Sequence, residues 1–150
     1  ESSSRYVTSA RDQGVTLINK VSDQLPKVMA DPTRIPHVFG NLISNALKHT
    51  TAGGQIELDA SWNEGDEQVT FSVQNTGIMI PEEYYNKIFE RFFRMPGEKI
   101  AEGVGLGLAI ARDIVVGHGG KIWAENSLAQ NGARFCFTLN TADSHQTLIS

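Results

Sequence analysis

Apolar residues recur every three or four positions between residues 31 and 49, a spacing that predicts an amphipathic helix. Asp31 and Pro32 suit its start as N-cap and first helical residue, and the run Thr-Ala-Gly-Gly at 51–54 ends it. The stripe expected to face the core consists of Ile35, Val38, Phe39, Leu42 and Ala46. The adjoining polar stripe consists of His37, Asn41, Asn45 and Lys48.

Strands are predicted where apolar and polar residues alternate or where apolar runs are short. Residues 55–62 and 68–73 flank the turn Asn-Glu-Gly-Asp and predict a β-hairpin. The other strand candidates are residues 15–18, 26–30, 121–126 and 133–139. Two more helices are predicted, one from Pro81 to about Phe93 and one from the glycine-rich run 103–107 to Gly117. The predicted fold class is therefore α/β (α+β), a two-layer sandwich with a mixed, mostly antiparallel sheet of about five strands on three helices.

Composition narrows the possible functions. The chain has 150 residues, of which 40% are hydrophobic and 20% charged, as expected for one globular domain. Its net charge of -4 argues against nucleic-acid binding, which needs a basic face. Its one cysteine, Cys136, forms no internal disulfide, and no apolar run approaches the roughly 20 residues of a membrane span. We therefore expect a cytoplasmic location, with no nucleic-acid or membrane contact by this domain.

The polar stripe of the first helix carries candidate chemistry. Asparagine is a poor helix former, so Asn41 and Asn45, four residues apart, call for a local reason. Magnesium takes one or two protein oxygens plus substrate phosphates, and the amide oxygen of Asn45 beside a triphosphate fits that habit. Lys48 would then neutralise phosphate charge. The alternative is an ordinary solvated helix face, and the segment taken alone favours this alternative.

Two glycine segments suggest a ligand site. Asn75 ends a predicted strand and is followed by Gly77, which permits close approach of a ligand, although a plain turn is equally compatible. Residues 103–112 join a bare backbone to a helix N-terminus, which favours phosphate binding. The segment is neither a Rossmann fingerprint nor a P-loop, since no strand is predicted before it and no GxxxxGK occurs. Leu106 and Leu108 are expected to pack rather than to take part in chemistry.

The order of these motifs is more specific than any one of them. The chain contains, in sequence, DPTRI (31–35), NLISNALKHT (41–50), NTGIMIP (75–81), IFERFFR (88–94), GVGLGLAIAR (103–112) and HGGKIWAEN (118–126). This series resembles the ATP-binding catalytic domain of sensor histidine kinases, in the superfamily shared with gyrase, MutL and the large heat-shock chaperones. The resemblance implies Mg-ATP binding under a mobile ATP lid. It also implies transfer of the γ-phosphoryl group to a histidine on a separate dimerisation domain of the same protein, with a response regulator as a further partner.

The resemblance also assigns domains. Residues 1–13 would be the end of a preceding helical linker, residues 14–139 the catalytic domain and residues 140–150 a flexible tail. The whole would be the cytoplasmic portion of a larger, membrane-anchored sensor. None of the four histidines precedes the asparagine helix, so the phosphoryl acceptor is expected on the partner domain.

Roles are carried over position by position. Asn45 would be the magnesium ligand and Asn41 its partner one turn earlier, while Arg94 would reach the phosphates from the lid helix. His37 either assists removal of a proton from the acceptor imidazole or is merely solvated. The predicted catalytic residues are Asn41, His37 and Arg94. The predicted nucleotide-binding residues are Asn45, Lys48, His49, Asn75, Gly77, Ile80, Gly103, Gly105, Leu106, Gly107 and Leu108.

The chain departs from the family pattern where adenine is recognised. Asn75 stands where an aspartate is almost always found, Met79 replaces a glycine, and Ala133 replaces a hydroxyl residue. The amide oxygen of an asparagine accepts a hydrogen bond from the adenine amino group without charge assistance, which weakens the bond. The sequence therefore leaves open a degenerate, weakly or non-nucleotide-binding regulatory module as an alternative to the kinase.

Asn41 bears on a third possibility, an ATP hydrolase. In the hydrolases of the superfamily this position is a glutamate that activates water, and an asparagine cannot act as a base. Phosphoryl transfer is therefore favoured over hydrolysis.

Overall fold

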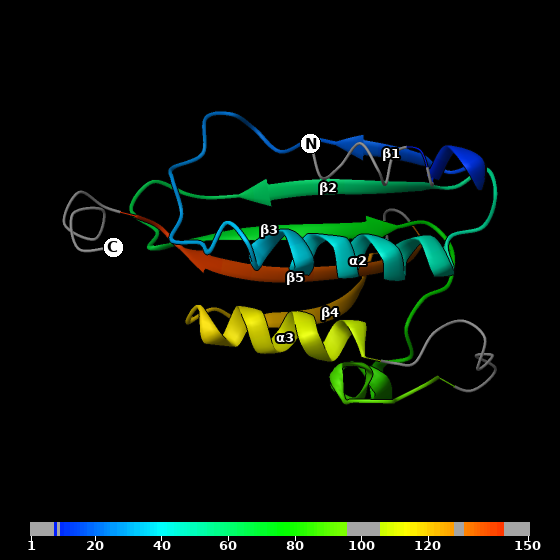
Figure 1. The fold of residues 1–150 in the computed structure, drawn as a ribbon. Helices are drawn as coiled ribbons and strands as arrows, with labels where there is room; N and C mark the ends of the chain where they lie inside the picture. The colour runs from blue at the N-terminus through cyan, green and yellow to red at the C-terminus, as the bar shows by residue number, and fades with distance from the viewer. Residues whose placement is uncertain (1–7, 9, 96–105, 128–130, 143–150) are drawn as a thin grey trace.

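A five-stranded mixed sheet forms one layer of the protein, and two α-helices lie side by side on one of its faces (Figure 1). The computed structural model describes residue 8 and residues 10–95, 106–127 and 131–142. The elements are β1 (Thr16–Asn19), α2 (Ile35–His49), β2 (Gln55–Ser61), β3 (Gln68–Asn75), the 3-10 helices η1 (Glu82–Tyr84) and η2 (Lys87–Phe89), α3 (Gly107–Gly117), β4 (Ile122–Ser127) and β5 (Gly132–Asn140). The strand order is β1-β2-β3-β5-β4, and only β1 and β2 pair in parallel. This architecture confirms the predicted two-layer sandwich.

The α2 helix buries the stripe that its periodicity predicted. Val38 and Leu42 are completely buried, and the half-buried ring of Phe39 packs edge-on against two phenylalanines of the sheet. Its centroid lies 5.6 Å from that of Phe71 and 5.1 Å from that of Phe137. Aromatic contacts of this kind stabilise by roughly 0.5–1.5 kcal/mol beyond area burial. In the described ranges no helix combines the length and the apolar character needed to cross a bilayer.

The predicted hairpin and closing strands are confirmed. β2 and β3 pair from Ile56 opposite Asn75 to Ser61 opposite Thr70. On β5, Phe135, Phe137 and Leu139 are all buried, as their shared face requires. The sheet also buries the single thiol of the chain, which lies on the opposite face of β5.

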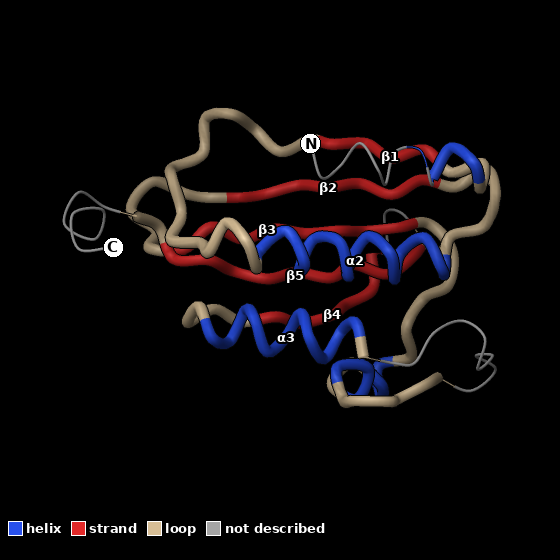
Figure 2. Tube along the Cα trace, viewed as in Figure 1, coloured by secondary structure: helices blue, strands red, loops and turns tan. Residues whose placement is uncertain are grey.

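The start of the first helix and one strand were predicted wrongly. α2 begins at Ile35, with Pro36 rather than Pro32 in its first turn. The carboxylate of Asp31 instead accepts hydrogen bonds from the N–H groups of Thr33 and Arg34, which stabilises a turn before the helix. Residues 26–30 form one antiparallel bridge rather than a strand, within the long loop that runs from β1 to α2 (Figure 2). Pro26 at its start has no N–H to donate to a ladder.

The helix predicted from Pro81 to Phe93 is also wrong, because this segment forms the two short 3-10 helices η1 and η2. The backbone extends at Glu90 and then adopts a left-handed conformation at Phe92, with φ of 65°. Packing decides the outcome: Ile88 and Phe89 are buried, and the ring of Phe89 lies 6.2 Å from that of Phe135. Tertiary contacts have overridden a local helical preference.

Candidate functional site

The polar stripe of α2 lies along the edge of its buried face. Asn41 and Asn45 are half-buried and one turn apart, while His37 and Lys48 are exposed and His49 is half-buried. The predicted stripe is therefore present on one helix. It offers two amide side chains at the boundary between core and solvent, where they can contact a ligand without being fully desolvated.

The beginning of α3 lies against this stripe. A Cβ placed on Gly107 would stand 3.8 Å from Cγ of Asn41, so the glycine backbone passes directly over the amide side chain. No side chain caps the start of α3. The first N–H groups of a helix have no intrahelical acceptor and carry the positive end of its dipole. An uncapped helix start, of the kind that favours anions, thus lies beside Asn41.

The other residues predicted around this helix start are distributed as follows. Leu106 and Leu108 are half-buried, and Leu108 packs on the hydrophobic core. Gly103 and Gly105 lie outside the described residues. The predicted role of these two glycines as lid hinge stays a prediction.

Asn75 ends β3 and is almost fully buried, with 2% of its surface exposed. Its Nδ2 donates a hydrogen bond to the carbonyl oxygen of Thr76 at 3.1 Å. Among the described residues, its Oδ1 has no hydrogen-bond partner. The amide is therefore oriented with its donor satisfied and its acceptor available to a ligand N–H group.

The loop after Asn75 packs on the end of α2. Gly77 has a φ of +131°, and a Cβ placed there would stand 2.6 Å from the carbonyl oxygen of His49. The close approach that the sequence predicted at Gly77 is thus made, in this structure, by the backbone of α2. Ile80, at the far end of the loop, is buried with 4% of its surface exposed. Gly107 and Gly77 consequently flank α2 two turns apart, at Asn41 and at His49.

Arg91 and Arg94 do not share a helix face, because η2 ends at Phe89 and residues 91–94 are not helical. The guanidinium of Arg91 makes an ion pair with Asp113 of α3 at 3.1 Å, and both side chains are largely exposed. Arg94 is half-buried and lies outside the helices and strands. The helix from which Arg94 was predicted to reach the phosphates therefore does not extend to this residue.

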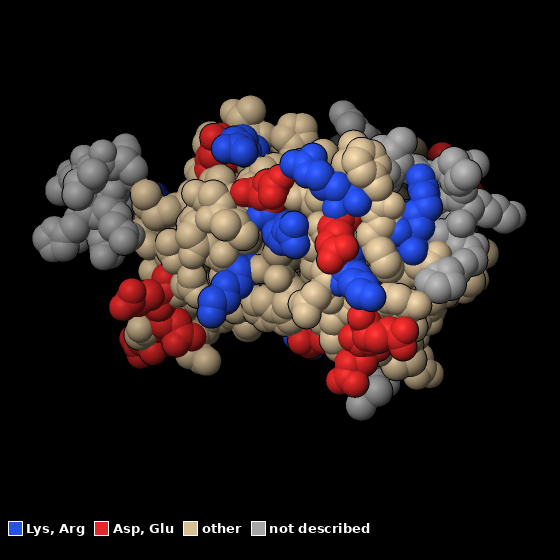
Figure 3. Space-filling model, turned by 90° about the horizontal axis from the view of Figure 1, so that it is seen from below, with Lys and Arg blue, Asp and Glu red and all other residues tan. Residues whose placement is uncertain are grey.

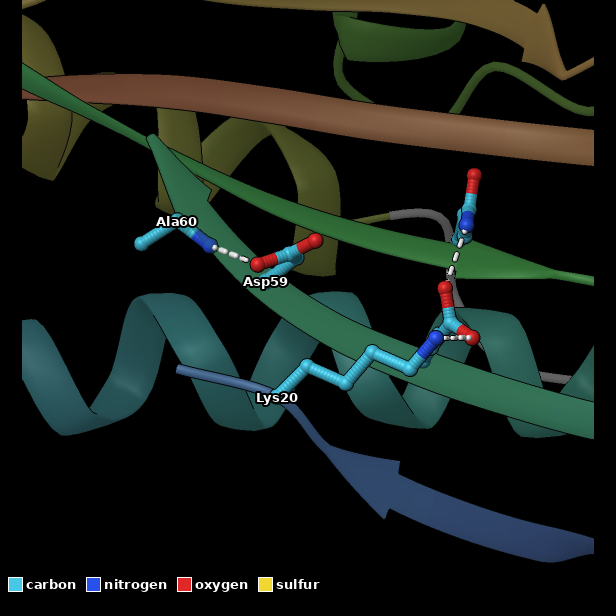
Figure 4. Close-up of polar contacts among 5 residues, drawn as sticks. Lys20, Asp59 and Ala60 are labelled. Carbon is cyan, nitrogen blue, oxygen red and sulfur yellow. Dashed lines mark hydrogen bonds and ion pairs between the residues drawn. The ribbon is translucent and has the colours of Figure 1, made fainter. Parts of the chain in front are cut away.

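Charged side chains of both signs alternate on the side of the protein formed by α3 and β4 (Figure 3). On the sheet, Lys20, which is labelled in Figure 4, forms a separate network with Glu57 and Gln74. Glu57 accepts from Nζ of Lys20 at 2.9 Å and from Nε2 of Gln74 at 2.7 Å. The hydrogen bond from Lys20 lowers the pKa of Glu57 below its ordinary value, and the bond from Gln74 adds to this effect. Beside this network, Oδ1 of Asp59 accepts from the N–H of Ala60.

Metal binding can be considered from the donor types present. Within the part of the chain that the structure describes, no three His, Cys, Asp or Glu side chains converge on a point where a metal could bind. The half-buried amides of α2 are hard oxygen donors of the kind that Mg²⁺ accepts when substrate phosphates complete its shell. The donor set therefore fits magnesium bound together with a phosphate ligand.

One contact near the site was not predicted. The side chain of Asn126 in β4 makes two hydrogen bonds to the backbone of Ile80. Asn126 is the last residue of the HGGKIWAEN motif, yet nothing in the local sequence indicates that its hydrogen-bond partner lies 46 residues away.

Comparisons with known proteins bear on the family and the fold of this chain. A family model described as "Histidine kinase-, DNA gyrase B-, and HSP90-like ATPase" matches residues 30–143. The sensor histidine kinase WalK of Bacillus subtilis (strain 168) is 39% identical over 131 residues, which is 86% of this chain and 21% of WalK. The chain thus spans about a fifth of the length of this relative.

Solved structures give the same picture. The nucleotide-free catalytic domain of histidine kinase ThkA aligns with a TM-score of 0.80 and 35% identity, covering 93% of this chain and 88% of that domain. ThkA has also been solved in complex with the response regulator protein TrrA, where the match has 33% identity and a TM-score of 0.76 and covers 93% of this chain and 38% of the ThkA chain. Full-length ShkA in complex with AMPPNP aligns with a TM-score of 0.79 and 32% identity, covering 95% of this chain and 29% of ShkA.

Proposed function

The chain belongs to the histidine kinase-, DNA gyrase B- and HSP90-like ATPase family, and on this basis we propose that it binds Mg-ATP and transfers the γ-phosphoryl group to a histidine on a separate dimerisation domain of a sensor kinase. The observation that best supports the proposal is the contact between Gly107 and Asn41. It joins a helix start suited to phosphate with a helix face suited to a hard cation.

The phosphate end of the site involves α2 and α3. Asn45 would offer its amide oxygen to Mg²⁺, with Asn41 beside it one turn earlier. The N–H groups that open α3 at Gly107 would donate to phosphate oxygens, and Lys48 would add positive charge. When bound, Mg²⁺ would neutralise charge on the triphosphate, which lowers the energy barrier to transfer of the γ-phosphoryl group.

The base end of the site would be formed by Asn75 and the loop after it. Oδ1 of Asn75 would accept a hydrogen bond from the adenine amino group, since its Nδ2 already donates to Thr76. Gly77 keeps the loop against α2, and the half-buried Leu108 would offer apolar surface to the base. Ile80 is buried and would support the loop from below its surface. A neutral amide in place of a carboxylate makes this recognition weaker than that of an aspartate.

Transfer is favoured over hydrolysis because Asn41 has no basic group with which to activate water. His37 is exposed on α2 and is a candidate to assist proton removal from the incoming imidazole, and Arg94 is a candidate to stabilise the transferred group. By analogy with ThkA, which has been solved with a response regulator, we propose that a response regulator receives the phosphoryl group from the parent kinase.

Calorimetry of Mg-ATP binding tests the proposal, with Asn45→Ala as the site variant. Ser44→Ala is the matched control, because Ser44 is the exposed neighbour on the same helix. We expect the wild-type chain and Ser44→Ala to bind Mg-ATP alike, and Asn45→Ala to bind at least roughly tenfold more weakly, the loss of about 1.4 kcal/mol. The absence of heat from the wild-type chain at millimolar Mg-ATP would reject the proposal.

A regulatory module without strong nucleotide binding is the second candidate. It is favoured by Asn75, by Met79 with its 37% exposed surface, and by the buried Ala133, which together remove three usual features of adenine recognition. The double variant Asn75→Asp, Met79→Gly separates the two candidates. Binding that appears only in the double variant would support the regulatory module, and binding already present in the wild-type chain would support the kinase.

A further inference from the structure

The side-chain amide of Asn126 is hydrogen-bonded to both backbone polar groups of Ile80, the N–H and the carbonyl oxygen. The N–H of Ile80 donates to Oδ1 at 2.7 Å, and Nδ2 donates to the carbonyl oxygen of Ile80 at 2.8 Å. A single side chain thus satisfies both backbone groups of one loop residue, as a neighbouring strand would. The two bonds also define the orientation of the amide, since its donor and its acceptor are each used once.

The sheet register explains why β4 can make this contact. The pairing of β4 with β5 sets Asn126 opposite Ala133, and the pairing of β5 with β3 runs to Gln74 opposite Arg134. Continued by one residue, the second register aligns Asn75 with Ala133 and so with Asn126. These three residues form one row across adjacent strands, on the face where Asn75 pairs with the fully buried Ile56. Two strand spacings separate Asn75 from Asn126, roughly 10 Å. The loop that leaves Asn75 therefore spans this separation, since Ile80 at its far end is hydrogen-bonded to Asn126.

The loop of residues 76–80 is anchored near each of its ends. At the near end, the N–H of Gly77 donates to the carbonyl oxygen of Asn131 at 3.2 Å. Ile78 and Met79 then lie in solvent, with 52% and 37% of their surfaces exposed. At the far end, Ile80 is buried and bonded to Asn126. Removing the Asn126 amide would leave the far end without its polar anchor.

We propose that Asn126 is a positioning residue for base recognition: by holding Ile80, it sets the path of the 76–80 loop past Asn75. This inference rests on the proposed function, because it assigns the loop to the base end of a nucleotide site. Asn126 would act on base recognition and not on phosphate binding, since the proposed phosphate end involves α2 and α3 and not β4.

The test compares ligands with and without a base. Affinities for Mg-ATP and for magnesium inorganic tripolyphosphate are measured by calorimetry for the wild-type chain, Asn126→Ala and Asn126→Asp. Asn140→Ala is the matched control, because this asparagine of β5 also makes two side-chain hydrogen bonds, to Gln68 and His118, at the other end of the sheet. Melting temperature and amide hydrogen exchange are recorded for every variant without nucleotide.

We expect Asn126→Ala to weaken Mg-ATP binding roughly tenfold, the effect of losing one or two hydrogen bonds, and to leave tripolyphosphate affinity within about twofold. Asn126→Asp keeps an acceptor for the N–H of Ile80 and should weaken ATP binding less. Asn140→Ala should lower the melting temperature without changing ATP affinity. In the nucleotide-free chain, Asn126→Ala should speed amide exchange in residues 77–80 and not in α2.

Equal ATP affinity in Asn126→Ala and the wild-type chain would overturn the inference. So would a parallel loss of tripolyphosphate affinity, which indicates a merely structural role, or unchanged exchange in residues 77–80. Failure of the wild-type chain to bind Mg-ATP would instead reject the proposed function, and this inference with it. The exchange result does not depend on nucleotide, so it still decides whether Asn126 holds the loop.

Discussion

The imidazole of His118 accepts a hydrogen bond from the backbone N–H of Asp31, with Nε2 and N 3.0 Å apart. Its other ring nitrogen, Nδ1, lies 2.8 Å from the carbonyl oxygen of Ile114. Because Nε2 accepts, the proton is assigned to Nδ1, which donates to Ile114. The ring thereby joins the C-terminus of α3 to the turn that precedes α2.

Replacing His118 with alanine should therefore destabilise the domain by about 1–3 kcal/mol, since it removes two hydrogen bonds and leaves the Asp31 N–H without a partner. Urea unfolding measures the change. His37→Ala is the control, and for this exposed residue we expect a change within about 0.5 kcal/mol. Equal stabilities of the two variants would contradict the role assigned to His118.

Gly77→Ala should be strongly destabilising. Its φ of +131° is disfavoured for residues with a Cβ, and the added carbon would stand 2.6 Å from the His49 carbonyl oxygen. We expect a loss of roughly 1–3 kcal/mol in thermal or urea unfolding. Gly117→Ala is the comparison, because a Cβ there meets no atom within 4 Å and the helical backbone needs no glycine. That variant should be neutral or up to about 1 kcal/mol more stable.

Asn75→Asp should change stability and binding in opposite directions. Without nucleotide, a carboxylate would face the carbonyl oxygen of Thr76, to which the amide now donates, so we expect a lower melting temperature. With Mg-ATP, the charged acceptor should tighten binding roughly tenfold. Thermal shift and calorimetry measure the two effects. Tighter binding without loss of stability would show that the Thr76 contact contributes little.

The Lys20–Glu57 pair predicts a pH dependence. Because the pKa of Glu57 is lowered in the folded protein, its contribution to stability is present above the ordinary value of 4.5 and is lost as the pH falls through the folded value. The pKa of Lys20 is raised, chiefly by its hydrogen bond to Glu57, so its contribution is lost only above 10.5. Glu57→Gln should thus be less stable than the wild-type chain at pH 6, and the difference should shrink below pH 4.5. A constant difference from pH 3 to pH 7 would contradict this assignment.

Elements whose periodicity agrees with their packing were predictable from the sequence. The buried residues of α2, from Ile35 to Ala46, repeat with the helical period. In β2 and β3, apolar and polar residues alternate on either side of a turn that contains glycine. The fold class followed from the order of such elements. The proximity of Asn41 to Gly107 was expected only from the family resemblance. The sequence around each residue does not indicate which helix start packs on which helix face.

The errors arise where distant contacts decide the backbone. The sequence of residues 81–93 favours a helix. In the structure the ring of Phe89 packs against that of Phe135, and Phe92 adopts a left-handed backbone conformation. Only two short 3-10 helices therefore form. The Asn126–Ile80 contact depends on the strand order β3-β5-β4, which no single segment encodes. Asp31 was expected to cap α2, but its carboxylate accepts a hydrogen bond from the N–H of Thr33 in the turn before the helix, and α2 begins at Ile35.

The lone thiol of this domain also has a practical use. Cys136 is 2% exposed, and burial raises its pKa to about 11, so alkylating reagents at neutral pH should modify it only after unfolding. Mass spectrometry after iodoacetamide treatment, with and without urea, checks this. A cysteine engineered on the surface should then accept a fluorophore selectively in the otherwise native chain. The fluorescence of that label could then be followed on addition of ligand without first deleting the natural residue.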